Sequence, residues 1–278
     1  MDTKLLWELF KKTGDIKYYN LLKKIQKKWW KMKIETFEGI ILSETNYSES
    51  SKILNVLTDK FGLIGIMSKG CRKMKSKLRG VSRKLLYGTF NVYYKEKGLS
   101  TLISIDVINS FSKTLMDLER ISYASFMIDL TYQVVKQNDS KEIFDLLRNV
   151  LIKLEEGLDP LVLTNILEIK LLDYLGITPN IDSCSSCGST KQIVTLSSEQ
   201  GGYICKDCHQ NEPLVSDKTI KIIRMYYYVD VSSISKLDVS REVTKEINTF
   251  LDDYYDRFTG LYVKSKDFIK KINQLENI

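Results

Sequence analysis

The chain has 278 residues, of which 43% are hydrophobic, and a formal net charge of +7 at pH 7. This length allows a substantial core and more than one module. No segment approaches the roughly 18 uncharged apolar residues of a membrane span, and charged residues interrupt every apolar run near the N-terminus. We therefore expect a cytoplasmic protein that has neither a signal peptide nor an integral membrane segment.

The positive charge is concentrated in two segments. Residues 1–33 carry ten lysines against three acids, a net charge of +7. Residues 69–84 carry eight lysines and arginines and no acid, so the rest of the chain has a net charge of −8. A protein that is merely basic does not require this segregation.

Residues 1–32 predict a basic amphipathic helical extension. Apolar residues recur at helical spacing in two pieces, separated at Thr13-Gly14-Asp15, with lysines on the other side. The apolar positions are Leu5, Leu6, Leu9 and Phe10, then Leu21, Leu22, Ile25 and Trp29. Such a segment could lie on an anionic membrane. Its short length and the break at Gly14 favour packing on the barrel or on a partner.

Residues 33–111 change to a pattern of short strands separated by turn signals. The strands are expected at residues 37–42, 51–58, 62–68, 85–95 and 99–108. Five strands with the longest connection between the third and fourth suit a closed barrel of the OB type. An SH3-like barrel is the competing structure.

Residues 112–180 and 213–278 show helical periodicity. Three helices are expected in the first part, ending with one from Leu161 to Leu175 that has Pro160 in its first turn. Gly157 and Gly176 suit helix ends. In the second part we expect helices over residues 216–228 and from Ser240 to the end of the chain.

Between these helical parts, residues 181–212 contain two matched cysteine pairs. Cys184 and Cys187 are separated by two residues, and so are Cys205 and Cys208. Two intervening residues allow both sulfurs to reach one metal ion, and the spacer suits a β-hairpin that returns the second pair. Four cysteines leave no open position for water. The sequence therefore predicts one structural Zn²⁺ in a zinc ribbon.

Other interpretations of the cysteines fit less well. Four unrelated buried cysteines or a redox pair would not require two matched pairs at zinc-ribbon spacing. An iron–sulfur cluster also uses four cysteines, but the spacing fits zinc better. His209 could replace a cysteine ligand, although a residue adjacent to a ligand usually points away from the metal. Cys71 lies among charged residues and is expected to be a surface thiol.

The basic segment suggests contact with a phosphate backbone, because cations that neutralise phosphates release counterions. The candidate DNA-binding residues are Lys69, Arg72, Lys73, Lys75, Lys77, Arg79, Arg83 and Lys84. On a β-barrel, a positive groove next to aromatic side chains binds single strands, and Phe90, Tyr93 and Tyr94 are candidates for stacking. The competing interpretation is a solvated loop whose charges serve solubility.

No catalytic arrangement is present in the sequence. There is no phosphate-binding loop, dinucleotide-binding glycine pattern or metalloprotease motif. A single histidine excludes mechanisms that need two. We therefore expect a binding protein and not an enzyme.

Several stretches, taken in order, resemble the RecO family of recombination mediators over residues 34–274. They are EGIIL (38–42), YSE (47–49), LTDKFGL (57–63), KGCRK (69–73), GLSTL (98–102), LDYLGITP (172–179) before the first cysteine pair, and LYVKSKDF (261–268). The resemblance implies an α+β protein with an N-terminal OB-fold domain, followed by an α-helical domain with an inserted zinc ribbon.

The resemblance also implies a function in DNA repair and recombination. Family members bind single- and double-stranded DNA, and some anneal complementary strands. They act with RecR and with the C-terminal tail of single-stranded DNA-binding protein, and help to load the RecA recombinase. A nucleoid-associated protein is therefore expected, and Lys69, Arg72, Lys73, Lys75 and Lys77 match the family's DNA contacts by position.

The N-terminus departs from this pattern, since family members usually start near Met32. The stretch LWELFKKTGDI (6–16) looks like a short YqzL-like protein fused upstream, and a misplaced start codon is the alternative explanation.

The competing function is a zinc-ribbon transcription or RNA-binding factor. Its ribbon would carry exposed basic or aromatic residues, whereas residues 183–209 contain only Lys191 and Lys206 as cations. This scarcity favours a structural ribbon.

Overall fold

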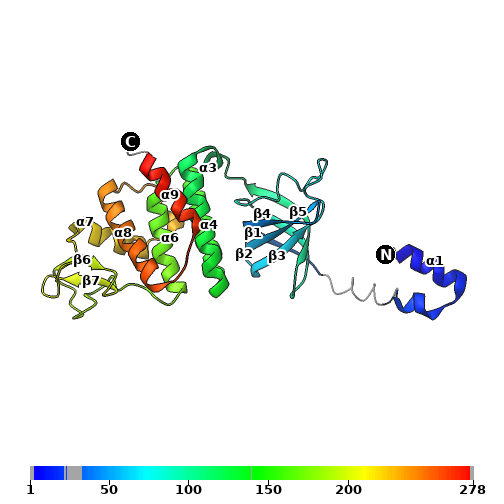
Figure 1. Ribbon diagram of the computed structural model, residues 1–278, viewed down its shortest axis with the longest axis horizontal. Helices are drawn as coiled ribbons and strands as arrows, with labels where there is room; N and C mark the ends of the chain where they lie inside the picture. The colour runs from blue at the N-terminus through cyan, green and yellow to red at the C-terminus, as the bar shows by residue number, and fades with distance from the viewer. Residues whose placement is uncertain (1–2, 22, 24–32, 139, 276–278) are drawn as a thin grey trace.

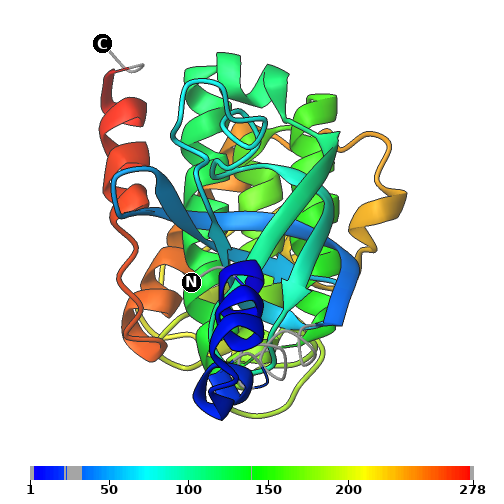
Figure 2. The same cartoon turned by 90° about the vertical axis from the view of Figure 1, so that its right-hand side faces the viewer.

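The computed structural model describes residues 3–21, 23, 33–138 and 140–275. An N-terminal helical segment, a β-barrel and a group of helices follow one another along the long axis of the molecule (Figure 1). The end-on view in Figure 2 has the N-terminal helix in front of the barrel and the other helices behind it. None of the helices in these described ranges is long and apolar enough to cross a membrane.

Five strands form the barrel. They are β1 (Lys33–Tyr47), β2 (Ser51–Thr58), β3 (Gly62–Ser68), β4 (Tyr87–Tyr94) and β5 (Ser100–Asn109). The sheet closes in the order β1-β2-β3-β5-β4, with a parallel β3–β5 pair and antiparallel pairs elsewhere. This confirms the predicted five strands, although β1 extends well beyond residues 37–42.

The length of β1 follows from its two partners. Its first half pairs with β4 from Lys33 to Ile40, and its second half pairs with β2 from Gly39 to Tyr47. A register shift between Ile41 and Ser43 marks a bulge, which bends a strand and increases its twist. The bend allows one strand to serve both sides of a closed sheet.

The helices form the second half of the molecule. They are α3 (Ser112–Met116), α4 (Leu118–Gln137), α5 (Lys141–Glu156), α6 (Pro160–Tyr174), α7 (Asp217–Tyr228), the 3₁₀-helix η1 (Val231–Ser233), α8 (Arg241–Phe258) and α9 (Lys264–Leu275). Helix α6 is buried over most of its length, from Val162 to Leu172, and contacts α4, α5, α7 and α8. It is therefore the central helix of this part.

Local side-chain and glycine signals begin and end these helices. The side chains of Asp117, Asp159 and Ser216 accept hydrogen bonds from backbone N–H groups in the first turns of α4, α6 and α7. Gly157 ends α5 with φ of 106°, a conformation that favours glycine.

The region from Ser240 onward, which was expected to be helical, contains two helices separated by a turn. Helix α8 ends at Phe258, Gly260 has φ of 61°, and α9 begins at Lys264. This turn lets α9 pack on α4, which a continuous helix would not reach.

The barrel and the helices share one apolar core. Five buried barrel residues belong to the same cluster as the helical core, namely Ile40, Leu42, Leu57, Leu85 and Tyr87. A second cluster, which includes Phe37, Leu54 and Phe90, fills the barrel alone. The two halves are therefore joined by packing as well as by the chain.

The N-terminal segment forms α1 (Thr3–Thr13) and a further helical stretch at residues 16–21. We call these the N-terminal hairpin, because Phe10 and Tyr19 pack at a ring-centroid distance of 5.2 Å. In Figure 1 α1 lies apart from the barrel, so the expected packing on the barrel is not seen for the described residues. The predicted apolar positions Leu22, Ile25 and Trp29 lie outside them.

Candidate metal centre and nucleic-acid interface

The four paired cysteines lie on a small two-stranded element that we call the cysteine hairpin (residues 181–212). Its strands are β6 (Ile193–Ser197) and β7 (Gly202–Cys205), which pair in antiparallel fashion. Backbone hydrogen bonds close each Cys-x-x-Cys turn, from Gly188 N to the Cys184 carbonyl (2.8 Å) and from Cys208 N to the Cys205 carbonyl (3.1 Å). Gly188 adopts φ of 74° in the first turn. The local backbone therefore directs both pairs toward one point.

The four sulfur atoms form a cluster. All four lie within 4.8 Å of one another, and those of Cys187 and Cys205 are 3.6 Å apart. A tetrahedral site with metal–sulfur bonds of about 2.3 Å has sulfur–sulfur distances of about 3.8 Å, whereas a disulfide is about 2.05 Å long. The arrangement fits four thiolates that could hold a metal ion.

His209 does not belong to this cluster. Its Nε2 atom lies 2.8 Å from the carbonyl oxygen of Glu212. The metal-ligand cluster found among the described residues contains only cysteines. His209 is therefore not one of the clustered ligands, which agrees with the expectation for a residue next to a ligand.

The thiols differ electrostatically. Burial acts to raise the pKa of Cys184, but backbone N–H groups, of which that of Cys205 lies 3.4 Å away, lower it to about 6. Hydrogen bonds with the neighbouring sulfurs of Cys187 and Cys205 raise the pKa of Cys208 to about 12. Four adjacent thiolates repel one another, and a bound cation would offset this repulsion.

The cysteine hairpin is attached to α7 by polar contacts. Asp182 accepts hydrogen bonds from Arg224 Nε at 2.9 Å and from the Tyr228 hydroxyl at 2.7 Å. The hydroxyl of Tyr203 donates to the carbonyl of Ile220. A metal that orders the hairpin would therefore also order the contacts of α7.

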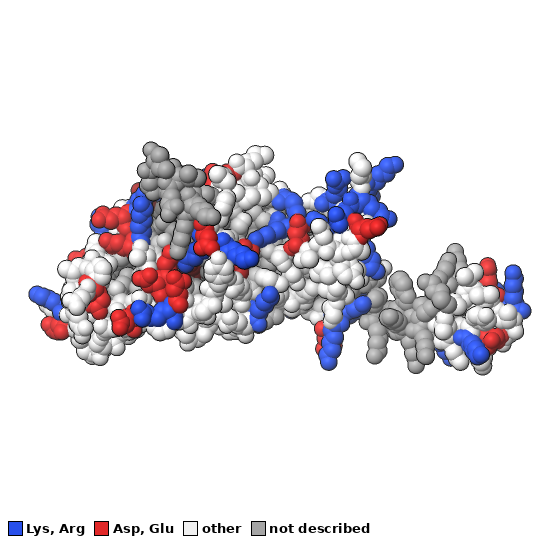
Figure 3. Space-filling view, in the orientation of Figure 1, with Lys and Arg blue, Asp and Glu red and all other residues white. Residues whose placement is uncertain are grey.

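The second candidate site is the connection between β3 and β4, which we call the basic loop (residues 69–84). Six of its cations are exposed, namely Lys69, Arg72, Lys73, Lys75, Lys77 and Arg79. None of the six forms an ion pair with another residue that the structure describes. Figure 3 shows Lys and Arg side chains projecting together from the barrel, whereas acidic side chains gather on the helical part.

The basic loop is anchored to the barrel. Leu78 and Val81 pack on the barrel core, and Lys52 Nζ donates to the carbonyl of Ser82 at 3.2 Å. The hydroxyls of Ser68 and Ser82 are 2.8 Å apart across the base of the loop. The loop therefore presents its cations from a fixed base, which lowers the entropy cost of ordering them on a ligand.

One face of the loop lies against the turn between β1 and β2. The backbone N–H of Arg72 donates to the Ser50 carbonyl at 2.9 Å, and its guanidinium donates to the Ser48 carbonyl at 3.2 Å. The loop and this turn therefore form one continuous surface.

Arg83 and Lys84 are placed differently from the other six candidates. Arg83 Nη2 donates to the Ser110 carbonyl at 2.9 Å, and Lys84 Nζ forms a 2.5 Å ion pair with Asp129 on α4. Both side chains are partly buried. Their contacts fasten the end of the loop to the start of the helical part.

Two expectations about this region are wrong. Phe90 is fully buried and stacks on Phe37 inside the barrel, so it cannot stack on a base. Cys71 is only 2% exposed and is not a surface thiol. Residues of β4 alternate between interior and surface, and Gly88, Phe90 and Val92 face inward. This alternation was the signal in the sequence that Phe90 belongs to the interior.

A partly buried aromatic pair at the edge of the barrel core lies elsewhere. Tyr94 stacks on Phe61 at 4.2 Å, and Lys60 Nζ lies 5.0 Å from the Phe61 ring. Phe61 precedes β3 and Lys69 follows it, so this pair and the basic loop lie at opposite ends of that strand. Tyr94 therefore does not adjoin the cations with which the sequence associated it.

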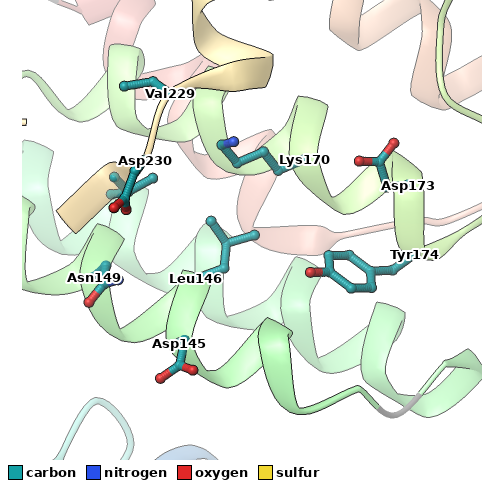
Figure 4. A pocket seen from close by; sticks show the side chains of 9 residues that line it. Asp145, Leu146, Asn149, Lys170, Asp173, Tyr174, Val229 and Asp230 are labelled. Carbon is teal, nitrogen blue, oxygen red and sulfur yellow. The ribbon is translucent and has the colours of Figure 1, made fainter. Parts of the chain in front are cut away.

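A cavity of about 290 Å³ in the helical part has the wrong charge for a phosphate site (Figure 4). Three carboxylates line it, from Asp145 on α5, Asp173 on α6 and Asp230 after α7. Its cation, Lys170, donates a hydrogen bond to the Tyr227 carbonyl. The acids would repel a phosphate, so the cavity adds nothing to the nucleic-acid interface.

Comparison with known proteins places this combination of sites in a family. The chain matches the model described as Recombination protein O N terminal over residues 32–111, and the one described as Recombination protein O C terminal over residues 115–267. The chain belongs to the RecO family. The resemblance expected from the sequence is thereby confirmed.

RecO proteins of several bacteria are similar over almost their whole length. The DNA repair protein RecO of Halalkalibacterium halodurans is 33% identical over 86% of this chain and 95% of the relative. That of Bacillus pumilus is 34% identical over 87% and 95%, and that of Listeria monocytogenes is 31% identical over 88% and 97%. The RecO match begins at residue 32, so the N-terminal hairpin lies outside it.

Within the RecO match, sequence reasoning missed the residues that hold the basic loop in place. Lys52 reaches the loop from β2 and also forms a 2.9 Å ion pair with Glu44. Asp129 receives Lys84 from the loop and Ser265 from α9, at 2.5 and 2.9 Å. The contacts of Lys52 with Ser82, of Lys84 with Asp129 and of Ser265 with Asp129 join residues that are 30, 45 and 136 positions apart. No local pattern marks them.

Proposed function

We propose that this RecO-family chain is a recombination mediator that binds single- and double-stranded DNA through the exposed cations of the basic loop. The observation that carries the proposal is the set of six exposed cations, none in an ion pair with a described residue, on a loop anchored to the barrel. Such cations gain from releasing counterions on a phosphate backbone without first breaking an internal ion pair.

We assign the barrel as an OB-fold domain over residues 33–111. The closed order β1-β2-β3-β5-β4 supports this assignment, and OB-folds bind oligonucleotides on strands 2 and 3 and on the loop between strands 1 and 2. The basic loop contacts that turn through Arg72. We assign the helical domain to residues 112–180 and 213–278, with a ribbon inserted at 181–212.

We further propose that Cys184, Cys187, Cys205 and Cys208 hold one structural Zn²⁺. Four thiolates complete a tetrahedral shell, which leaves no position for a reacting water. The two cations of the hairpin, Lys191 and Lys206, are too few for a DNA-reading finger. The same scarcity gives no support to a zinc-ribbon transcription or RNA-binding factor.

The proposed partners follow from family membership. We propose that the protein acts at the nucleoid with RecR and single-stranded DNA-binding protein, helps to load RecA, and anneals complementary strands. It is a binding protein in this proposal, and the described residues supply contacts with DNA but no assigned catalytic group.

The test compares two quadruple alanine variants in a salt titration of single-stranded DNA binding. One replaces Lys69, Lys73, Lys75 and Lys77 in the basic loop, and the control replaces Lys218, Lys221, Lys236 and Lys245, which are exposed on the helical part. The loop variant should bind more weakly and lose up to about 3 units of the slope of log K against log salt. The control should keep the slope of the unmodified protein.

Equal slopes in the two variants would remove the basic loop from the DNA interface. The same titration on DNA covered by single-stranded DNA-binding protein, with RecR present or absent, tests the partners. Tighter binding is expected when the acidic C-terminal tail of that protein is intact. The same affinity with and without the tail would contradict the partnership.

A further inference from the structure

The N-terminal hairpin carries aromatic rings and cations on one surface. Trp7 is 43% exposed, and Lys11 Nζ lies 5.5 Å from the centre of its ring. Just after the second helical stretch, Lys23 Nζ lies 5.0 Å from the centre of the ring of Tyr19, which belongs to that stretch. Each cation is four residues after its aromatic partner, the spacing that places two side chains on the same helix face.

The hairpin is built by its own contacts. Leu6 is fully buried, and the ring of Phe10 packs between those of Trp7 at 5.7 Å and Tyr19 at 5.2 Å. Asp15 begins the second stretch by accepting a hydrogen bond from the backbone N–H of Lys17 at 2.9 Å. The aromatic surface is therefore formed before any ligand arrives, which reduces the cost of binding.

The charge of the hairpin favours a polyanion. Residues 3–23 contain five lysines and two acids, a net charge of +3. In Figure 1 α1 lies beyond the barrel, on the side away from the helical part, and Figure 2 shows it in front of the barrel along the same axis. A strand held by the barrel could therefore continue to the hairpin.

We propose that the N-terminal hairpin is a second contact for single-stranded DNA, with bases stacking on Trp7 and phosphates held by neighbouring lysines. Aromatic side chains next to cations are the surface on which proteins bind single strands with little sequence preference. The inference rests on the proposed DNA-binding function of the barrel and adds a contact that the RecO match does not cover.

A single strand fits this surface better than a membrane does. Helices that lie on a bilayer separate their cations from an apolar face, whereas Lys11 and Lys23 lie over aromatic rings. Leu5, Ile16 and Leu21 are also exposed, and this apolar area makes a membrane the alternative that the test must address.

Tryptophan fluorescence of the full chain tests the proposal. All three tryptophans lie within residues 1–30, so Trp29→Phe with Trp30→Phe leaves Trp7 as the reporter. Oligothymidylate should quench Trp7. Lys11→Ala should weaken the quenching, whereas Lys12→Ala, an exposed neighbour that is not over a ring, should not. In the chain that keeps Trp29 and Trp30, Trp7→Ala should lower the affinity for a labelled oligonucleotide about fivefold or more.

Two further arms separate the possible outcomes. In the basic-loop quadruple variant the oligonucleotide should still quench Trp7, at higher concentration. If the protein binds DNA and Trp7 is not quenched, the hairpin proposal fails while the proposed function stands. If the loop variant binds DNA normally, the assigned barrel surface fails instead. A blue shift with phosphatidylglycerol vesicles, without quenching by DNA, would assign the hairpin to a membrane and overturn the proposal.

Discussion

At the scale of single residues, Glu168 is buried in the helical part with an incompletely satisfied carboxylate. It is 1% exposed, and neither carboxylate oxygen has a hydrogen-bond partner among the residues that the structure describes. Lys266 Nζ lies 3.7 Å away but is closer to Asp252, at 2.7 Å. Burial, opposed in part by Lys266, raises the pKa of Glu168 to about 8.

This raised pKa predicts that stability falls as pH rises. The folded state keeps a proton that the unfolded chain loses near its ordinary pKa of 4.5, so the folded state binds more protons between about pH 4.5 and 8. The free energy of unfolding should decrease over this window, by at most about 1.4 kcal/mol per pH unit for this one group.

Glu168→Gln should flatten this pH dependence, because a neutral amide replaces the carboxyl group. Urea unfolding at pH 5, 6, 7 and 8 measures the effect, with the exposed Glu242→Gln as the matched control. The variant should gain stability relative to the unmodified protein as pH rises. A pH dependence equal to that of the unmodified protein would show that Glu168 is already ionised in the folded state.

At the scale of elements, the cysteine hairpin has a small core of its own. Cys184, Ile204 and Cys205 form a separate buried cluster, too small to hold a fold without a further constraint. A structural metal supplies such a constraint in small elements. The hairpin is also fastened to α7 through Asp182 and Tyr203.

Metal removal should therefore release this element first. The purified protein should contain one zinc per chain, and Cys184→Ser should lose it, whereas Cys71→Ser, at a buried cysteine outside the cluster, should keep it. After chelation, amide hydrogens of residues 182–212 and of α7 should exchange faster, and the affinity for single-stranded DNA should change less than about twofold because the basic loop lies on the barrel. Loss of DNA binding before any loss of protection would assign the hairpin a direct role.

At the scale of the whole molecule, the barrel and the helices behave as one packed unit. The shared core includes Leu42 of β1 and Leu85, which directly follows the basic loop, alongside residues of α4, α5 and α6. The ring of Tyr87 packs against Phe144 at 6.4 Å across the junction. Destabilising one side of this core should therefore destabilise the other.

Leu42→Ala tests this coupling. The substitution should cost about 2–5 kcal/mol of stability, because it leaves a cavity in a fully buried site. Amide hydrogens in β1 and in α4 should lose equal amounts of protection from exchange. The control is Leu118→Ala on α4, where the leucine is 64% exposed and the substitution should cost less than about 0.5 kcal/mol of stability. Loss confined to the barrel strands would show that the two halves unfold separately.

The distribution of charge is also a property of the whole molecule. Residues 1–33 and the basic loop are strongly positive, and the remaining residues have a net charge of −8. The fold keeps the loop on the barrel, with the acidic side chains gathered on the helical part (Figure 3). The exposed cations of the basic loop would therefore attract an approaching polyanion to the barrel.

The sequence by itself determined the local features of this protein. Alternation in the strands, helical periodicity, the helix-capping residues and the spacing of four cysteines each depend on residues close together in the chain. For this reason β2, β3 and α6 lie where they were expected, and the cysteines converge as their spacing predicted. The ordered motifs were also sufficient to indicate the RecO family.

Only the tertiary structure decided what depends on distant partners. Phe90 is buried in the barrel core against Phe37, and Cys71 is buried although its sequence neighbours are charged. Lys84 is not among the exposed cations because it pairs with Asp129, 45 residues away. The turn at Gly260 is used because α4 offers α9 a surface to pack on. Burial and pairing are properties of the folded chain. The position of a charged or apolar residue in the sequence therefore does not identify the residues that it contacts.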